Sequence, residues 1–388
     1  MERKYTLALA MICGCVPAVL AQSPARYLVG VVSEAGDIVT WLKPVPGGAL
    51  ALDRIVKVDP RPPEMDGPHN ITVAPDQKSY YVTISHGTPY GALWRLDALT
   101  DRVIGTAPLE AYPTTIGLTP DGEFAFVANS DFYGDRPKVN PVTIVHTPTM
   151  TTITNIGACD MPHGAKSNHS GRIVYISCMH SDEILEIDVS TLAISRRIKL
   201  GKGHAPASGG HSGHAPAGGV PPMPADSHEM PGPVAPGAGP DMNKECAATF
   251  VSVSADDSRF FVACNSGNAL QVWDASSRTL IKSIPTGAGA YNVEPSPDGK
   301  LILVTNKKDQ SISVIDAMTL VERKRIPVAK KIVHGVAFSP DGRYAYITQE
   351  SIGADPGAVD VLDLSTLLIT SSFAVPAQPT GVTILRQD

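Results

Sequence analysis

One pattern recurs along this chain and limits what it can fold into. Six segments align on a turn rich in Asp and Gly, followed by a strand of alternating aromatic and aliphatic residues: APDQKSYYVTI (74–84), TPDGEFAFVAN (119–129), NHSGRIVYISC (168–178), SADDSRFFVAC (254–264), SPDGKLILVTN (296–306) and SPDGRYAYITQ (339–349). With one insertion allowed for, the pattern returns about every 41 to 49 residues, which is the length of a four-stranded propeller blade. Frequent Gly and Pro and few aromatic residues suit short strands joined by tight turns.

The number of blades follows from how the two ends of the chain complement each other. Six full units run from about residue 68 to residue 375. The N-terminal part supplies three strands without an inner one, YLVGVVSE (27–34), DIVTWLK (37–43) and LALDRIVKV (50–58), and the C-terminal part supplies one inner strand, PTGVTIL (379–385). Together they predict an all-β, seven-bladed propeller of four-stranded antiparallel blades, whose closing blade leaves no free sheet edge. Residues 22–388 are therefore predicted to form one domain.

The repeat also resembles a known family. The stretch SPDGKLILVTNKKDQSISVIDAMT (296–319) is similar to the YVTN repeat of seven-bladed propeller proteins, and the resemblance covers nearly all of the chain except 201–245. At the level of the fold it extends to the propeller domains of nitrous oxide reductase and cytochrome d1 type proteins. It implies the fold and says little about function, because such propellers include binding proteins, surface proteins and enzymes.

The N-terminal residues predict export. Arg3 and Lys4 precede an apolar run that ends in small residues, which is typical of a signal peptide covering residues 1–21. An alternative is a lipoprotein signal with Cys15 as the anchored residue. No later run is long and apolar enough for a membrane span. We expect a periplasmic protein, or one otherwise exported.

Charge and motifs exclude two further classes. The net charge is −6 and no block of Lys or Arg occurs, which argues against nucleic acid as a partner. No Cys-x-x-Cys-His motif occurs, so covalently attached haem is not expected. The partner remains a periplasmic protein or a small ligand at the mouth of the central channel.

Histidines recur at one position of the repeat. The residue just before each inner strand is, in blade order and ending with the closing blade, His69, Thr114, His163, Ala248, Tyr291, His334 and Thr380. Inner strands line the channel, so three imidazoles are expected to point at one mouth, and imidazole suits copper or zinc. The arrangement resembles the ring of histidines by which nitrous oxide reductase holds copper, although most of that set is missing. The alternative is that each histidine bonds a backbone carbonyl.

Other metal-binding side chains are expected on the same rim. His86 and His180 follow second strands of their blades and extend the predicted metal site. The segment 201–245 is rich in Gly, Pro and Ala and is predicted to be disordered, either as a metal-delivery arm or as a plain linker. Its candidate ligands are His204, His211, His214, Met223, His228, Met230 and Met242.

The cysteines after the signal peptide form two similar pairs. Cys159 and Cys246 each precede an inner strand, and Cys178 and Cys264 each end the following strand. In an oxidising compartment this even set predicts the disulfides Cys159–Cys178 and Cys246–Cys264. The alternative is a copper site that uses the thiolate of Cys178 or Cys264.

Three functions remain open at this point. The first is a periplasmic metal-binding propeller, with copper as the first candidate metal. The second is a non-catalytic scaffold that binds a protein or ligand. The third is a lactonase-like hydrolase around an axial cation, which would need oxygen ligands. The residues expected to form the rim of the pocket are Asn129, Tyr133, Arg136, Tyr291, Asn306 and Glu350.

Overall fold

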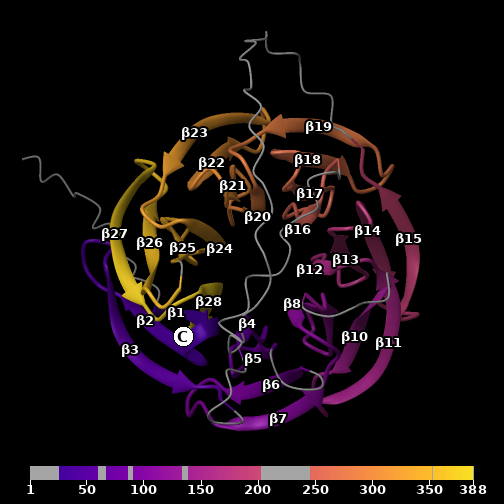
Figure 1. Ribbon diagram of the computed structural model, residues 1–388, viewed down its shortest axis with the longest axis horizontal. Helices are drawn as coiled ribbons and strands as arrows, with labels where there is room; N and C mark the ends of the chain where they lie inside the picture. Colours follow the sequence, from indigo (N-terminus) through magenta and orange to yellow (C-terminus); the bar gives the residue numbers. More distant parts are fainter. Residues whose placement is uncertain are drawn as a thin grey trace, which may run out of the picture.

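Seven four-stranded antiparallel sheets are arranged as the blades of a ring (Figure 1). The computed structural model describes residues 26–59, 67–85, 91–132, 139–201, 245–351 and 353–387. The predicted signal peptide and most of the predicted arm lie outside these residues. Within them, no helix is both long and apolar enough to cross a membrane.

The sheets follow one another along the chain. The first four blades are β28 (Pro379–Arg386), β1 (Tyr27–Ser33), β2 (Ile38–Pro44) and β3 (Leu50–Lys57); β4 (Pro68–Val73), β5 (Ser79–Ile84), β6 (Ala92–Asp97) and β7 (Val103–Pro108); β8 (Pro113–Leu118), β9 (Phe124–Asn129), β10 (Asn140–His146) and β11 (Thr151–Cys159); and β12 (Pro162–Ser167), β13 (Ile173–Cys178), β14 (Glu183–Asp188) and β15 (Ala193–Lys199). A short 3-10 helix, η1 (Glu34–Gly36), follows β1.

The remaining three blades repeat this order. They are β16 (Ala248–Val253), β17 (Arg259–Cys264), β18 (Ala269–Asp274) and β19 (Leu280–Pro285); β20 (Ala290–Pro295), β21 (Leu301–Asn306), β22 (Ser311–Asp316) and β23 (Val321–Pro327); and β24 (Ile332–Phe338), β25 (Tyr344–Glu350), β26 (Gly357–Asp363) and β27 (Leu368–Val375). The sequence-based prediction of the fold is confirmed, including the closing blade: the C-terminal strand β28 pairs with β1.

The hydrophobic core is divided among the contacts between blades. Seven clusters of buried apolar side chains each join two adjacent blades, and the cluster around Tyr27, Val29 and Tyr346 joins the last blade to the first. Each blade therefore depends on its neighbours to bury both faces of its sheet.

The acidic turns of the repeat are structural. The carboxylate of Asp316 accepts hydrogen bonds from the amides of Met318 and Thr319. Asp97, Asp188, Asp274 and Asp363 do the same in their own blades. In all of these turns except that of Asp316, a side-chain hydroxyl of the turn also donates to the carboxylate. The hydroxyl and amide bonds together lower the pKa of the aspartates and hold the turn between the third and fourth strands. The acidic residues that recur in the repeat are explained by the turns alone.

Candidate functional site

A β-bulge lies near the start of six inner strands. In β4 the pairing register shifts between Pro68 and Ile71, and it shifts at the same place in β8, β12, β16, β20 and β24. A bulge bends the strand and re-aims the side chains within it. His69, His163 and His334 all fall inside these bulges. We call the rim where inner strands begin and second strands end the histidine rim, and the opposite rim the turn rim.

The structure corrects one position of the histidine register. Ala248 pairs with Cys264 as Pro162 pairs with Cys178, so the residue of blade 5 equivalent to His163 is Thr249. The prediction had given Ala248 this place, although the aligned repeat segments themselves point to Thr249: His163 lies five residues before its segment (168–178), and Thr249 lies five residues before its own (254–264). The equivalent residues also belong to the strands themselves, whereas the sequence had placed them just before.

The three threonines of this register tie neighbouring blades together. The hydroxyl of Thr114 donates to the carbonyl of His163 at 3.0 Å, that of Thr249 to Tyr291 at 2.6 Å, and that of Thr380 to His69 at 2.7 Å. These hydroxyls therefore hold adjacent blades together. The positions that depart from threonine are the three histidines and Tyr291.

The three predicted histidines come together at the axis. The ring centroid of His69 lies 6.2 Å from that of His163 and 5.7 Å from that of His334. All three side chains are buried. Tyr291, also predicted for the site, packs against His334 with 4.7 Å between ring centroids. The side chain of Phe250 contacts His163 and Tyr291 and lies beneath them.

His163 has a partner at both ring nitrogens. Nδ1 lies 2.9 Å from the carbonyl oxygen of Thr249, and Nε2 lies 3.0 Å from the hydroxyl of Tyr291. A carbonyl only accepts, so Nδ1 carries the proton and Nε2 accepts from Tyr291. Burial, together with the nearby charges of His69 and Lys307, lowers the pKa of His163 to about 3. This histidine is neutral at physiological pH and has no lone pair left for a ligand.

His69 is held differently. Its Nδ1 lies 3.2 Å from Oε2 of Glu34, and Oε1 of Glu34 accepts a 2.6 Å hydrogen bond from the hydroxyl of Tyr112. The carboxylate favours the proton on Nδ1, which leaves the lone pair on Nε2. Within the described part of the chain, Nε2 is buried and has no hydrogen-bond partner. A carboxylate that orients an imidazole in this way is the arrangement of a general base.

His334 is the second histidine with an unused nitrogen. Its Nε2 is 3.8 Å from Oε1 of Glu350, and its buried Nδ1 has no hydrogen-bond partner among the described residues. Burial lowers the pKa of His334 well below its usual value, and the positive charge of Lys307 acts in the same direction.

One cation lies beside these imidazoles. The Nζ of Lys307 is 3.7 Å from Oε1 of Glu350 and 3.7 Å from the ring centroid of Tyr291. Burial lowers the pKa of Lys307, an effect that Glu350 opposes, and burial raises the pKa of Glu350, an effect that Lys307 opposes. Burial also raises the pKa of Tyr291, so its hydroxyl remains protonated. The cluster thus combines three imidazoles, two carboxyl groups and one amine.

The cluster does not have the arrangement of a metal centre with three or more ligands. In the ranges that the structure describes, no group of three or more His, Cys, Asp or Glu side chains is placed to hold a metal ion. Two ring nitrogens have no hydrogen-bond partner among the described residues, Nε2 of His69 and Nδ1 of His334, and the backbone of Thr380 lies close enough to His334 to oppose the lowering of its pKa.

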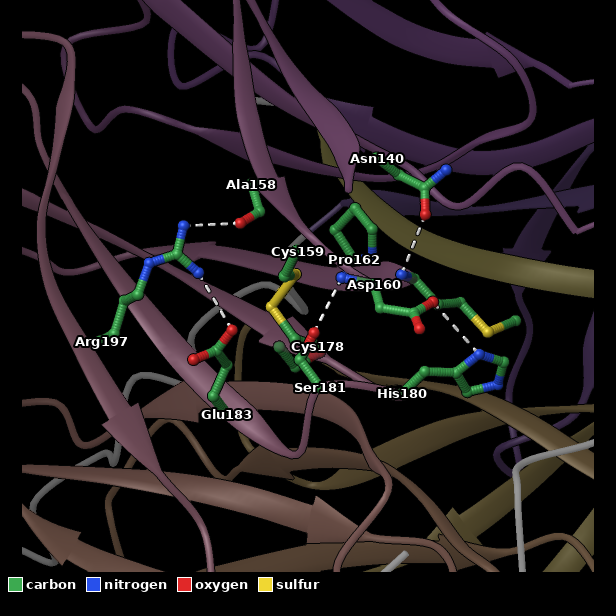
Figure 2. The surroundings of a disulfide bond; sticks show 12 residues. Asn140, Ala158, Cys159, Asp160, Pro162, Cys178, His180, Ser181, Glu183 and Arg197 are labelled. Atoms are coloured by element: carbon green, nitrogen blue, oxygen red, sulfur yellow. Dashed lines mark hydrogen bonds and ion pairs between the residues drawn. A yellow bond between two sulfur atoms is a disulfide. The ribbon is translucent and has the colours of Figure 1, made fainter. Parts of the chain in front are cut away.

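Both predicted disulfides are present. Cys159 and Cys178 are bonded, as are Cys246 and Cys264. Figure 2 shows the first bridge, with Arg197 and Glu183 on one side and Asp160 and His180 on the other. Cys159 ends the outer strand of blade 3, so this bridge also joins two blades. Disulfides form and persist in oxidising compartments, which agrees with export.

The other predicted site residues are placed as follows. His180 lies beside Asp160, with 3.3 Å between Nδ1 and Oδ1, in the turn after β13. Asn129 is buried and donates to Thr143 of the neighbouring strand, and the side-chain amide of Asn306 lies 3.0 Å from the hydroxyls of Ser311 and Ser313. These amides hold second and third strands together. His86, Tyr133, Arg136 and the ligands predicted in the arm lie outside the described residues.

Sequence reasoning missed Glu34, Tyr112, Lys307 and Phe250. A second register would have found two of them. Alignment of the second strands makes Glu34, Lys307 and Glu350 equivalent residues, with Ser85, Ser130, Met179 and Asn265 in the other blades. The sequence signal for this cluster is a charged residue directly after an aligned segment, as Lys307 follows 296–306 and Glu350 follows 339–349.

The comparisons with known proteins agree on the fold and reach little further. No family model matches the chain. A 6-phosphogluconolactonase of Yersinia enterocolitica is 27% identical over 120 residues, which are 31% of this chain and 35% of that protein. The chain thus matches about a third of the length of this curated relative.

Two solved structures are similar over almost the whole chain. One is a functionally unknown protein from Desulfotomaculum acetoxidans, with a TM-score of 0.68, 12% identity, and coverage of 93% of this chain and 99% of that one. The other is a periplasmic gluconolactonase of Pseudomonas aeruginosa, with a TM-score of 0.67, 16% identity, and coverage of 93% and 99%. At these identities the likeness concerns the propeller fold.

Proposed function

We propose that this protein is an exported hydrolase that opens a lactone or a similar cyclic ester at the axial cluster. One observation carries the proposal: Glu34 orients His69 so that a buried imidazole nitrogen with an unused lone pair points away from the carboxylate. An imidazole whose orientation is fixed by a carboxylate is well suited to take a proton from water.

The proposed reaction uses this pair in two steps. Nε2 of His69 takes a proton from water while the water oxygen bonds to the lactone carbonyl carbon. The tetrahedral intermediate then expels the ring oxygen, which receives the same proton back from His69, and the product is a hydroxy acid. Glu34 stabilises the imidazolium that forms between the steps.

Lys307 supplies the charge that the intermediate needs. Its ammonium group is held by Glu350 and the face of Tyr291. A fixed cation in a largely water-free site stabilises an oxyanion better than water does. The rings of Tyr291, which is buried, and Phe250, which is partly buried, pack beside the cluster.

The relatives support the reaction class. The curated relative is a 6-phosphogluconolactonase, and one of the similar structures is a periplasmic gluconolactonase. Both names describe lactone opening, and the second protein shares the compartment that the disulfides favour here.

The test measures hydrolysis of five- and six-membered aldonolactones, both phosphorylated and unphosphorylated, with proton release as the readout. Wild-type protein is expected to open at least one of them faster than the buffer does. His69→Gln should lower kcat by about 10²- to 10⁴-fold, the usual effect of a general base. Glu34→Gln should also lower kcat, because the amide does not favour the same tautomer.

His169→Gln is the matched control. His169 is exposed at the turn rim, where it pairs with Asp257 at 2.8 Å, and its loss should leave kcat unchanged. Equal rates for wild type and His69→Gln on every lactone would refute the hydrolase and favour the scaffold function.

The metal-binding function is a second candidate, favoured by the two unused nitrogens of His69 and His334. Imidazole is a suitable ligand for both copper and zinc. Metal analysis of untagged protein tests it: stoichiometric copper in the wild type should be lost in His334→Ala. Absence of metal from both samples after exposure to copper would end this candidate.

A further inference from the structure

The turn rim has its own opening into the axis. A funnel of about 690 Å³ is lined there by the inner strands of all seven blades. Lys166 and Glu294 form an ion pair inside it, with 2.9 Å between Nζ and Oε1. The wide end of the channel is therefore polar, and it lies on the face opposite Glu34, Lys307 and Glu350.

A second, small cavity separates this funnel from the histidines. It has a volume of about 40 Å³. It shares with the funnel the wall residues Asn70, Thr115, Phe250, Asn292, Val336 and Val382. His69, His334 and Thr380 line the small cavity and do not line the funnel. The small cavity is thus the space between the imidazoles and the solvent-filled side of the channel.

The walls of this cavity need a hydrogen-bonding occupant. Nε2 of His69 and Nδ1 of His334 are both buried and have no hydrogen-bond partner in the described structure, and leaving a buried polar atom without a partner is unfavourable. Asn70, Thr115 and Asn292 add polar groups. A polar cavity holds a water molecule when it offers at least about 10–15 Å³ and two to four partners.

We propose that the small cavity binds one ordered water molecule between His69 and His334. A water molecule both donates and accepts, so it satisfies Nδ1 of His334 in either tautomer, whereas a cation needs lone pairs on both nitrogens. In the hydrolysis proposed above, on which this role rests, the bound water is the nucleophile.

Crystals of the untagged wild-type protein, with data to about 1.5 Å and an anomalous data set, test the site. The expected result is a peak about 2.7–3.2 Å from both nitrogens without anomalous signal. A peak about 2.0–2.1 Å from the nitrogens with anomalous signal is a metal ion and overturns the proposal. An empty cavity overturns it as well.

Variants test the role in catalysis. Asn292→Leu and Thr115→Val place apolar groups in the shared wall, and each should lower kcat about tenfold with little change in KM. Ser167→Ala lines only the funnel and is the control, with kcat expected to match the wild type. Thermal melting checks that each variant folds. If Asn292→Leu does not fold, Thr115→Val still tests the role, because valine has nearly the same shape as threonine.

The two proposals fail separately. If the wild type opens no lactone but the water peak is present, the hydrolase is refuted and the water site stands. If lactones are opened and Asn292→Leu and Thr115→Val both retain wild-type kcat, the water site is not the source of the nucleophile.

Discussion

Three histidines at one position of the repeat have three different environments. His163 bonds at both nitrogens, His69 at one, and His334 only approaches a carboxylate. What differs is the neighbour at the end of a second strand: Glu34 reaches His69, and Glu350 reaches His334. The repeat therefore supplies a common position, and the unrepeated neighbours decide whether the side chain is structural or available for chemistry.

Burial of neutral histidine predicts a loss of stability in acid. The pKa of His163 is about 3 in the folded protein, below the usual value near 6.5 in the unfolded chain. The unfolded chain binds the proton first, so the stabilisation is present above about pH 6.5 and is lost as the pH falls toward 3. From pH 7.5 to pH 5, His163 should cost about 2 kcal/mol of the free energy of unfolding, and His334 acts in the same direction.

Urea unfolding at a series of pH values measures this slope. His163→Gln should be less stable at pH 7.5 and should lose less stability on acidification. His169→Gln changes an exposed histidine and should keep the wild-type slope. A wild-type free energy that is flat between pH 7.5 and 5 would contradict the neutral, buried state of His163.

The sequence predicted the histidine triplet because repeats of equal length place equivalent residues at equal heights on the axis. It did not predict Glu34 or Tyr112, whose contacts with His69 come from blades 1 and 3. Nor did it predict that both ring nitrogens of His163 are hydrogen-bonded, one to Thr249 and the other to Tyr291. These contacts depend on side-chain directions set by the bulges, and a bulge leaves no mark in so short a strand pattern.

At the scale of elements, the blades next to the 201–245 segment are reinforced. Cys246–Cys264 ties the entry of β16 to the end of β17, and the carboxylate of Asp182 accepts the backbone amides of Glu245, Cys246 and Ala247. The first inner strand after the segment is thus fixed both covalently and by hydrogen bonds to blade 4. The equal spacing of the cysteines in the repeat was sufficient to predict both bridges.

Removing the second bridge should destabilise the protein without abolishing the fold. The double variant Cys246→Ala/Cys264→Ala is expected to lose about 2–4 kcal/mol of unfolding free energy, the usual value for a loop of this length. Urea unfolding with and without reductant measures this loss. Reduction should lower the unfolding free energy of the wild type by breaking both bridges, and that of the double variant only by breaking its remaining bridge, Cys159–Cys178.

Cys159→Ala/Cys178→Ala is the matched control for the same loop size. With both pairs replaced, sensitivity to reductant should disappear. Retained sensitivity would mean that the bridges in solution differ from those of the structure.

At the scale of the whole molecule, the ring holds because both ends of the chain share one sheet. β28 pairs with β1 from Tyr27↔Arg386 to Ser33↔Pro379, and the hydroxyls of Tyr27 and Tyr346 bond at 2.6 Å across the junction with blade 7. Figure 1 shows β28 at the axis beside β1 and β4. The closing blade was predictable because the N-terminal part of the sequence contains three strands without an inner one, and the C-terminal part contains an inner strand alone.

Deletion of residues 379–388 should open the ring. It would expose the apolar edge of β1, and an unpaired edge strand promotes association. We expect soluble aggregates in size-exclusion chromatography and a melting temperature lower by at least about 10 °C. A synthetic peptide of residues 376–388 should partly restore the monomer, and deletion of residues 387–388 alone should have little effect. A monomeric truncation with wild-type melting would contradict the closure.

Ring closure also fixes the order in which the chain can fold. Six blades are built from neighbouring segments and can form as each hairpin appears, whereas blade 1 must wait for the last strand to be synthesised. Contacts between distant segments form slowly, because the entropy of closing the loop is lost before the contact is gained. Until β28 is made, the first blade consists of β1, β2 and β3 alone, so the inner edge of β1 stays open and the ring cannot close.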